Sequence, residues 1–337
     1  MNSMVVFILR RLVWLMVTLF FVAALMFGLS RMVPADPARL AMGEQATEDD
    51  IARMRELMGL DRPVHVQFFS YIGGLTRGDL GTSIRNQRPV LQDIRIYLPA
   101  TLELALLATV MFVGLGIPLG VLAALNRGKP IDSFVRITSI VGVGMPSFWL
   151  ALVLQVVMFK ELGWFPSGGR VDPLLQQVPA TTGLLLIDTA IAGDGRAFVS
   201  ALHHLVLPAF TLMLGRLAIT LRFARRSFLE TASKDFVRTA RSKGVREESV
   251  IRRHILRNSL IPVVTLLGLQ LGQLLAGTVL VETVFSWPGI GKYAVDAISH
   301  LDYPAVMGVA IVITVVFVLA NLAVDIVYTL LDPRIRY

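Results

Sequence analysis

The feature of this sequence that most limits its fold is a series of long apolar blocks. They lie at roughly 9–31, 99–125, 134–159, 204–224, 259–281 and 305–331. Each reaches about 20 residues, the length that a helix rising ~1.5 Å per residue needs to cross a hydrocarbon layer of ~30 Å. The chain of 337 residues is 55% hydrophobic and only 17% charged, which is little charge for a soluble protein of this length. The sequence therefore predicts an all-α, polytopic membrane bundle with six transmembrane helices.

The first apolar block could be a transmembrane helix or a signal peptide. Arg10 and Arg11 precede an apolar run from Leu12 to Leu29. A cleaved signal peptide has a shorter apolar core and a cleavage site flanked by small residues. We therefore interpret residues 1–31 as an uncleaved first transmembrane helix, with a cleaved signal peptide as the alternative.

The distribution of Lys and Arg between the loops predicts the orientation of the spans. Residues 222–257 hold eleven Lys and Arg against four acidic residues, whereas the loop 282–304 holds one Lys against three acidic residues. Basic residues are enriched in cytoplasmic loops, so 222–257 is predicted to lie in the cytoplasm. Six spans then place both termini there, including residues 332–337. The segments 32–98 and 161–203 are predicted to lie outside.

The segment between the first two spans is predicted to form a small folded region. Thr47 can cap a helix that Gly59 ends. Three acidic residues follow the cap, at the end of the helix that favours negative charge. A second amphipathic stretch covers 64–75, and glycines at 78–83 indicate a turn. The other external segment, 161–203, is expected to contain short helices.

Four of the prolines in or beside the predicted spans bear on helix starts and kinks. Pro99 and Pro208 lie near predicted helix starts, where a missing N–H group costs least. Pro118 and Pro146 fall inside the second and third spans, where each removes an intrahelical hydrogen bond. We expect kinks at both of these positions.

The chain carries no sequence motif for ATP binding, metal binding or nucleophilic catalysis. Gly128-Lys129 and Gly291-Lys292 lack the rest of a phosphate-binding loop. There is no cysteine, and the five histidines show no metal-ligand spacing. The net charge of +8 matches the cytoplasmic bias of Lys and Arg, and no basic stripe is interleaved with aromatic residues as nucleic-acid binding would require. We expect no enzymatic activity, cofactor, metal or nucleic acid for this chain.

Charged residues are rare inside the predicted spans: more than two residues away from a span end, only Glu103, Arg216 and Asp325 occur. Ion-coupled carriers place several acidic residues near the membrane midplane, so this pattern argues against them. Arg216 is the deepest, about 16 Å along its helix from the outer end. An intramembrane Arg must face a partner or a cavity. Two interpretations stay open: a structural pair, with Glu103 or a partner subunit, and a position along a translocation path.

The cytoplasmic segment 235–244 carries the most informative pattern. Its apolar residues Phe236, Val237 and Ala240 can lie along one side of a short helix, which Gly244 would end. The alternative is a solvated loop of ordinary cytoplasmic composition. Because the segment is too long for a simple connector, we predict a short helix that inserts into a groove on a soluble motor protein.

This segment resembles the cytoplasmic signature of the membrane subunits of binding-protein-dependent ABC importers, roughly Glu-Ala-Ala, three residues, Gly and then Ile-x-Leu-Pro. Thr239-Ala240, the three-residue gap and Gly244 match it. Arg238 replaces the Glu, and Ile261-Pro262 lies farther along the chain than in the signature, two departures that recur in the peptide/nickel branch. The stretch 186–191 resembles the first permease of dipeptide importers. Three further stretches resemble the peptide/nickel branch: Glu282 to Gly291, Gly78 to Gly81 and Asp332 to Ile335.

The resemblance implies a type I ABC importer permease in the bacterial inner membrane, with a periplasmic region at 32–98 and a five-helix transmembrane core at 99–331. Its partners would be a second homologous permease, two cytoplasmic ATPase subunits that bind ATP and Mg, and a periplasmic substrate-binding protein. The substrates would be dipeptides or short peptides. Nickel complexes, haem or longer peptides are the alternatives on the same architecture, and an ion-coupled carrier is the alternative from another class.

The resemblance also assigns roles to residues. Residues 235–244 would be the coupling helix in the ATPase groove, and segment 285–288 would shape an outer gate or form a structural hairpin. The expected coupling residues are Asp235, Arg238, Thr239, Ala240, Lys243 and Gly244. The expected path or gate residues are Arg216, Phe285, Trp287 and Pro288.

Overall fold

The computed structural model describes residues 3–32, 36–43, 45–175 and 179–331 of the chain. Within these ranges the regular structure is helical, apart from an isolated bridge between Thr82 and Pro89. Five of the described helices are long and apolar enough to cross a membrane, and the number is six if a bent pair over 130–161 counts as one span. The predicted all-α, polytopic bundle is therefore confirmed. The predicted cytoplasmic C-terminus, 332–337, lies outside the described residues.

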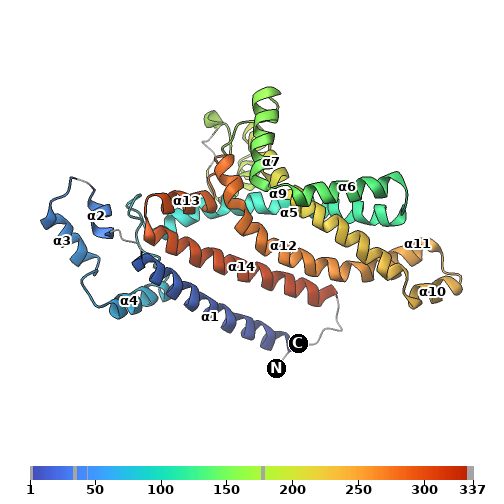
Figure 1. Ribbon diagram of the computed structural model, residues 1–337, viewed down its shortest axis with the longest axis horizontal. Helices are drawn as coiled ribbons and strands as arrows, with labels where there is room; N and C mark the ends of the chain where they lie inside the picture. The colour runs from blue at the N-terminus through green and yellow to red at the C-terminus, as the bar shows by residue number, and fades with distance from the viewer. Residues whose placement is uncertain (1–2, 33–35, 44, 176–178, 332–337) are drawn as a thin grey trace. The chain divides into compact units, whose positions relative to one another are not determined.

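The chain divides into two compact units, each of which is considered by itself. Unit 1 comprises Met1–Thr101 and Pro288–Val318, and unit 2 comprises Leu102–Trp287 and Leu319–Tyr337. Two long helices, α5 (Val90–Leu125) and α14 (Tyr303–Leu331), run from one unit into the other. Figure 1 gives the course of the chain through all the labelled helices.

Unit 1 combines helices from both ends of the sequence. The helices wholly inside it are α1 (Ser3–Met32), α2 (Pro37–Met42), α3 (Glu48–Leu57), α4 (Val64–Thr76) and α13 (Ile290–Ser299). Its core joins Ala23 of α1, Val90 and Ile94 of α5, Ile290 of α13 and Val309 of α14. The predicted external region therefore folds together with the segment that precedes the last span.

The helices predicted between the first two spans are confirmed. The Thr47 hydroxyl accepts a first-turn backbone N–H of α3 at 3.3 Å, and Gly59 has a φ of +65° just beyond the helix end. Helix α4 covers the stretch predicted at 64–75. The apolar face of α3 is used only in part, because Ile51 is buried whereas Leu57 is 80% exposed.

The turn predicted at 78–83 is also present. Gly78 and Gly81 have φ of +78° and +85°, a region that only glycine enters without strain. The buried Asp302 carboxylate, at the start of α14, accepts the hydroxyl of Ser83 and two backbone N–H groups at 3.1 and 3.3 Å. These donors compensate the burial of its charge, so Asp302 fixes the residues that follow the turn.

Unit 2 is organised around α9 (Gly195–Ala232), which at 38 residues is the longest described helix. Helices of the unit that pack against α9 are α6 (Pro130–Gly144), α7 (Ser147–Leu154), α8 (Leu185–Ile191) and α12 (Arg257–Val284). The shorter elements are the π-helix η1 (Gln155–Glu161), the 3₁₀ turn η2 (Pro173–Leu175), α10 (Asp235–Ser242), α11 (Glu247–Ser249) and the π-helix η3 (Val250–Leu256).

Glycines allow α5 to approach α9 closely. A Cβ atom at Gly120 would lie 2.8 Å from the carbonyl oxygen of Leu221 and 2.9 Å from the Cβ of Ala224. One at Gly116 would lie 2.8 Å from a methyl carbon of Thr220. These distances are too short for a side chain. The contact is therefore of the small-residue kind that brings membrane helices together.

The third predicted span is two helices, and the kink predicted at Pro146 is a complete break. Helix α6 ends at Gly144, α7 begins at Ser147, and the axes on either side differ by 101°; Figure 1 shows α7 turning away from α6. Met145 is extended, with φ −87° and ψ 121°. The proline ring disfavours helical backbone in the preceding residue and removes one N–H donor.

Two helices begin nine residues earlier than predicted. Helix α5 begins at Val90 rather than 99, and α9 begins at Gly195 rather than 204. Pro208 therefore lies inside α9 and Pro99 inside α5, not near the helix starts, and residues 195–203 form the first turns of α9. The cap that starts α9 is Asp194, whose carboxylate accepts two backbone N–H groups at 3.0 Å. The length of an apolar run indicates only the part of a helix that crosses the hydrocarbon core. Helical turns that continue beyond the core are more polar and are missed.

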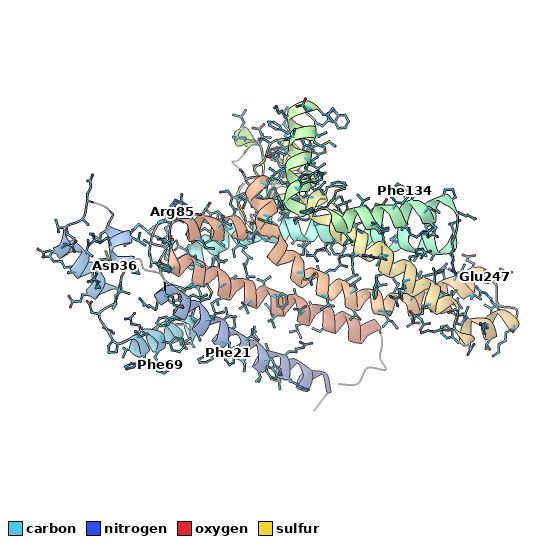
Figure 2. The ribbon with its side chains drawn as sticks, viewed as in Figure 1. Phe21, Asp36, Phe69, Arg85, Phe134 and Glu247 are labelled. Atoms are coloured by element: carbon cyan, nitrogen blue, oxygen red, sulfur yellow. The ribbon has the colours of Figure 1, made fainter. Side chains whose placement is uncertain are left out.

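The candidate spans present apolar side chains on their surfaces. Phe21 of α1 in unit 1 and Phe134 of α6 in unit 2 are each 66% exposed (Figure 2). Large apolar side chains at such positions are stable when they meet lipid chains instead of water. The surface therefore agrees with a protein embedded in a membrane.

Candidate coupling helix and membrane polar path

Helix α10 is anchored to unit 2 by a small apolar cluster. Val237 is fully buried and Ala240 is 7% exposed. They pack with Phe228 of α9 and with Val250 and Ile255 of η3. The short helix predicted at 235–244 is therefore confirmed as an element. Its buried side connects it to α9 and, through η3, to the start of α12.

The opposite side of α10 is open. Asp235 and Arg238 have side chains 95% and 74% exposed, with their charged atoms 3.5 Å apart. Phe236 is 41% exposed and does not join Val237 in the core, contrary to the predicted grouping of these apolar residues. Successive residues of a helix are rotated by about 100° around its axis, so Phe236 points away from the buried side on which Val237 lies. The open side thus presents one aromatic ring among charged groups.

The turn after α10 is braced by an ion pair. The Arg241 guanidinium donates two hydrogen bonds to the Glu247 carboxylate, at 2.6 and 3.0 Å. These bonds raise the pKa of Arg241 above its ordinary value. Lys243 and Gly244 lie between the paired residues and are exposed, and Gly244 has a φ of +74°. Both predicted contact residues therefore sit on a defined turn.

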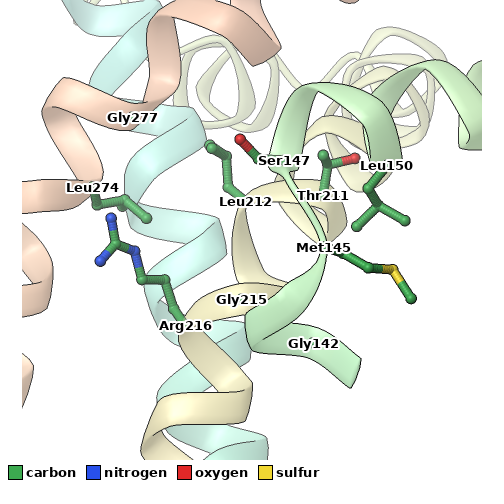
Figure 3. A pocket seen from close by; sticks show the side chains of 10 residues that line it. All are labelled: Gly142, Met145, Ser147, Leu150, Thr211, Leu212, Gly215, Arg216, Leu274 and Gly277. Carbon is green, nitrogen blue, oxygen red and sulfur yellow. The ribbon is translucent and has the colours of Figure 1, made fainter. Parts of the chain in front are cut away.

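Arg216 projects from α9 toward α12 beside a small cavity (Figure 3). The cavity has a volume of about 100 Å³ and also reaches the break between α6 and α7. The guanidinium donates to the side-chain oxygen of Gln273 at 2.7 Å. The residues around it are Gly142, Met145, Ser147, Leu150, Thr211, Leu212, Gly215, Leu274 and Gly277.

The structural pair suggested for Arg216 and Glu103 is not formed. Glu103 is bound instead by Arg170, at 2.6 Å, and by the backbone N–H of Leu186 at 2.7 Å. Arg170 also donates to the carbonyl oxygen of Gly183 at 2.7 Å. Glu103 therefore ties α5 to the segment between η1 and α8 and to the first turn of α8. Arg170 lies in a loop far along the chain, so sequence spacing gave no sign of this pairing.

Two of the residues predicted to form a gate, Phe285 and Trp287, lie in the interior. Phe285 is 1% exposed and Trp287 is fully buried, whereas Pro288 is partly exposed. The Phe285 carbonyl accepts the N–H of Gly169 at 2.9 Å, and a Cβ at Gly168 would lie only 2.1 Å from that oxygen. The end of α12 is therefore clamped against the 167–170 loop, which sequence reasoning did not identify.

Metal binding finds no support in the described part of the chain. Within those ranges, no three His, Asp or Glu side chains come together as metal ligands would. His203 and His204 instead contact backbone carbonyl oxygens, of Trp164 at 2.7 Å and of Ser200 at 2.8 Å. The distinctive features of the described residues are therefore an anchored helix with an open charged side and a guanidinium within the bundle.

These features define a polytopic helical membrane protein in which the short helix α10 exposes a charged side. Comparison with protein families identifies it further. Residues 116–337 match the binding-protein-dependent transport system inner membrane component, and residues 4–105 match the N-terminal region of the same kind of membrane component. The chain belongs to this family of transport permeases. Membership confirms the predicted integral membrane permease, a transporter subunit rather than an enzyme.

Individual relatives align along almost their whole length. The chain is 46% identical to the probable D,D-dipeptide transport system permease protein DdpB of Escherichia coli, over 97% of each chain. It is 44% identical to the di/tripeptide transport system permease protein DppB of Pseudomonas aeruginosa, over 99% of each. It is 37% identical to the oligopeptide transport system permease protein AppB of Bacillus subtilis, over 99% of this chain and all of the relative.

Proposed function

We propose that this chain is one of two permease subunits of an ATP-driven importer that carries dipeptides or short peptides across the bacterial inner membrane. The observation that carries the proposal is α10, anchored by Val237 and Ala240 and open on its other side. The names of the relatives support a peptide substrate, since they include dipeptide, di/tripeptide and oligopeptide permeases. Both termini and segment 222–257 face the cytoplasm, as the bias of Lys and Arg favours.

The coupling step follows from how α10 is attached. Asp235, Arg238, Thr239, Lys243 and Gly244 are exposed and contact a groove on a cytoplasmic ATPase. Ala240 acts from the buried side by holding the helix to its anchor. When the ATPase moves, α10 moves with it, and the apolar cluster passes the displacement to α9 and α12. The ATPase supplies the free-energy difference between the two permease states, which any two-state switch requires.

The remaining partners complete the importer complex. A second homologous permease forms the other half of the path, and two ATPase subunits bind the ATP and Mg that this chain does not bind. A periplasmic binding protein delivers the peptide to the outer face, where 32–98 contacts it. Arg216 faces the path. The segment 285–288 forms part of the outer gate, with Phe285 and Trp287 held in the interior.

The decisive experiment uses the absence of cysteine from the sequence. Lys243→Cys places a single thiol on the open side of α10. In cells that also produce the ATPase subunits, we expect this thiol to crosslink to an ATPase carrying a cysteine in its groove. Arg252→Cys, on the exposed surface of η3, is the matched control and should crosslink far less. Equal crosslinking at both positions, or none at 243 with normal expression, would refute the coupling role.

The peptide substrate is tested separately. Proteoliposomes holding the complete importer, with the ATPase subunits facing the lumen, should accumulate a radiolabelled dipeptide only when ATP is enclosed in the lumen. Excess unlabelled dipeptide should block this uptake, whereas a nickel complex or haem should not. Preferential uptake of nickel or haem would replace the substrate while leaving the architecture intact. Uptake without ATP would indicate an ion-coupled carrier.

A further inference from the structure

A basic cavity opens in unit 2 where the connection between α5 and α6 meets the last turns of α9. Its volume is about 590 Å³. Five charged side chains line it: Arg127, Arg222, Arg225, Arg226 and Glu230. The residues that line this cavity belong neither to α10 nor to the cavity beside Arg216, so the proposed function does not account for its excess of positive charge.

One of the four arginines is already neutralised. Arg225 donates to both oxygens of Asp132, at 2.5 and 3.0 Å, and its side chain is only 20% exposed. This pair fixes α9 to the first turn of α6 and builds one wall of the cavity. The charge available to a ligand therefore comes from the other arginines.

The other three guanidinium groups are free to bind an anion. Arg127, Arg222 and Arg226 are exposed, and none forms an ion pair with a carboxylate in the described part of the chain. Against the single carboxylate of Glu230, they leave an excess of two positive charges. Arg222 and Arg226 are four residues apart on α9, so they project from the same side of the helix. Two neighbouring guanidinium groups match the oxygens of a phosphate well.

The connection that carries Arg127 lies between exposed apolar side chains, which in a membrane would contact lipid chains. On α5, Leu122 and Leu125 are 42% and 45% exposed, and Phe134 on α6 is 66% exposed (Figure 2). These side chains flank the connection that carries Arg127. Within about one helical turn, the surface changes from apolar to basic. That change marks the level at which acyl chains give way to phosphate headgroups.

We propose that this cavity binds the headgroup phosphate of an anionic phospholipid. Arg222 and Arg226 are the main ligands, Arg127 is a third, and the acyl chains lie along Leu122 and Leu125. The assignment to the cytoplasmic leaflet rests on the orientation given above as part of the proposed function. The binding itself rests only on the cavity, its charges and its apolar border, so it can fail or hold independently of the transport role.

The test measures lipid binding to the purified full-length chain. Native mass spectrometry in neutral detergent would count bound phosphatidylglycerol across a titration, with phosphatidylcholine as the neutral lipid. For Arg222→Gln/Arg226→Gln we expect the apparent Kd for phosphatidylglycerol to rise on the order of 30-fold, because each basic group at an anionic surface contributes about fivefold. Arg222→Lys/Arg226→Lys should retain most of the affinity. Phosphatidylcholine should bind all variants equally.

The matched control is Arg252→Gln/Arg253→Gln, which removes two exposed arginines from η3. It should change the Kd less than twofold. Equal losses in both double variants would overturn the proposal, since attraction would then be non-specific. If inorganic phosphate competes as well as phosphatidylglycerol at equal concentration, the site takes a free anion and the lipid assignment is wrong.

Two further outcomes guard against misinterpretation. If the double variant keeps its lipid affinity but no longer co-purifies with the ATPase subunits, the arginines contact protein, and the proposal is refuted. If its melting temperature shows that it does not fold, Arg127→Gln takes its place, with an expected loss of about fivefold. An unchanged Kd in that single variant would refute the role of Arg127 as a ligand and with it the three-arginine site.

Discussion

Arg216 belongs to a chain of polar groups that joins α9 to α12. The Gln270 amide donates to the Thr220 hydroxyl at 3.1 Å, and that hydroxyl donates to the backbone carbonyl of Arg216 at 2.9 Å. The Arg216 side chain then donates to Gln273 at 2.7 Å. A charged guanidinium is energetically costly inside a membrane, and hydrogen bonds to neutral groups alone rarely offset that cost. The cavity beside it offers the space for water or for a passing polar substrate.

We therefore predict that Arg216→Gln impairs transport more than folding. Loss of a charge-assisted hydrogen bond costs about 1.5–3 kcal/mol, so peptide uptake in proteoliposomes should fall by roughly 10- to 100-fold. Arg216→Lys should recover part of the rate because it restores the charge. The melting temperature of the complex provides the control. If Arg216→Gln prevents assembly with the second permease, the residue is a structural partner in that interface instead.

Asp188 gives a prediction about pH. Its buried carboxylate accepts the N–H and hydroxyl of Thr182, both at 2.7 Å, and the N–H of Gly183 at 3.0 Å. Burial alone would raise the pKa of Asp188, but these hydrogen bonds outweigh it, and the pKa lies below its ordinary value. A depressed pKa contributes stability that is complete above the unfolded value of about 3.9 and is lost as pH falls through the folded value.

The loop around Asp188 should accordingly stay closed at neutral pH and open only below about pH 4. Hydrogen exchange at the amides of Thr182 and Gly183 would follow this opening. Asp188→Asn should speed their exchange at pH 7 by destabilising the loop about 1–3 kcal/mol, and it should remove the step below pH 4. An Asn variant with the wild-type exchange rate at neutral pH would show that the charge is not what holds the loop.

At the scale of elements, the close contact of α5 with α9 depends on the absence of a side chain at the glycines where the two helices meet. Gly120 has no room for a Cβ, whereas Gly114 on the same helix has no atom within 4 Å of that position. Alanine in a helix is favoured over glycine by about 0.5–1 kcal/mol. Gly114→Ala should therefore raise the melting temperature slightly.

Gly120→Ala should have the opposite sign. The methyl group would meet backbone atoms of α9, and overpacking of this kind costs about 1–3 kcal/mol, more than the helical gain. Thermal unfolding of both variants in the same detergent measures the difference. Equal stabilisation in the two variants would mean that α5 can move away from α9 without penalty.

The elements predicted correctly are those whose signals are local. The cap at Thr47, the stop at Gly244 and the apolar pair Val237 and Ala240 each act within a few residues, so α3 and α10 could be read from the sequence. The break at Pro146 was predicted only as a kink, because proline identity does not reveal whether a neighbouring helix restores the lost contacts. The early start of α9 was missed because its cap lies outside the apolar block.

The polar pairs of the site were less accessible to sequence reasoning. Arg170 reaches Glu103 from 67 positions away, and Gln273 reaches Arg216 from 57 positions away. No periodicity links residues at such separations; only packing brings them together. For the same reason, the burial of Phe285 and Trp287 was not foreseen. The sequence of an apolar segment at a predicted membrane surface does not show whether its side chains line a gate or are buried in the protein core.

At the scale of the whole molecule, the proposed coupling requires that a change at α10 reach the path through packed helices. The apolar cluster around Val237 provides a rigid attachment, and rigid attachment is what allows a displacement to pass to α9 and α12 without being absorbed locally. Contacts on the open side of α10 therefore should affect coupling, while leaving the fold of the permease unchanged.

Charge reversal at Arg238 separates these two effects. The Arg238 side chain is 74% exposed, and exposed charge pairs contribute at most about 1 kcal/mol to stability, so Arg238→Glu should melt within a few degrees of wild type. In the reconstituted importer it should still permit assembly but lower peptide uptake per ATP hydrolysed severalfold, because a repelled helix follows the motor poorly. Arg253→Glu, a reversal at an exposed position of η3, should leave that ratio unchanged. If both reversals lower it equally, the ATPase responds to total charge rather than to a grip on α10, and the mechanical role of this helix has to be abandoned.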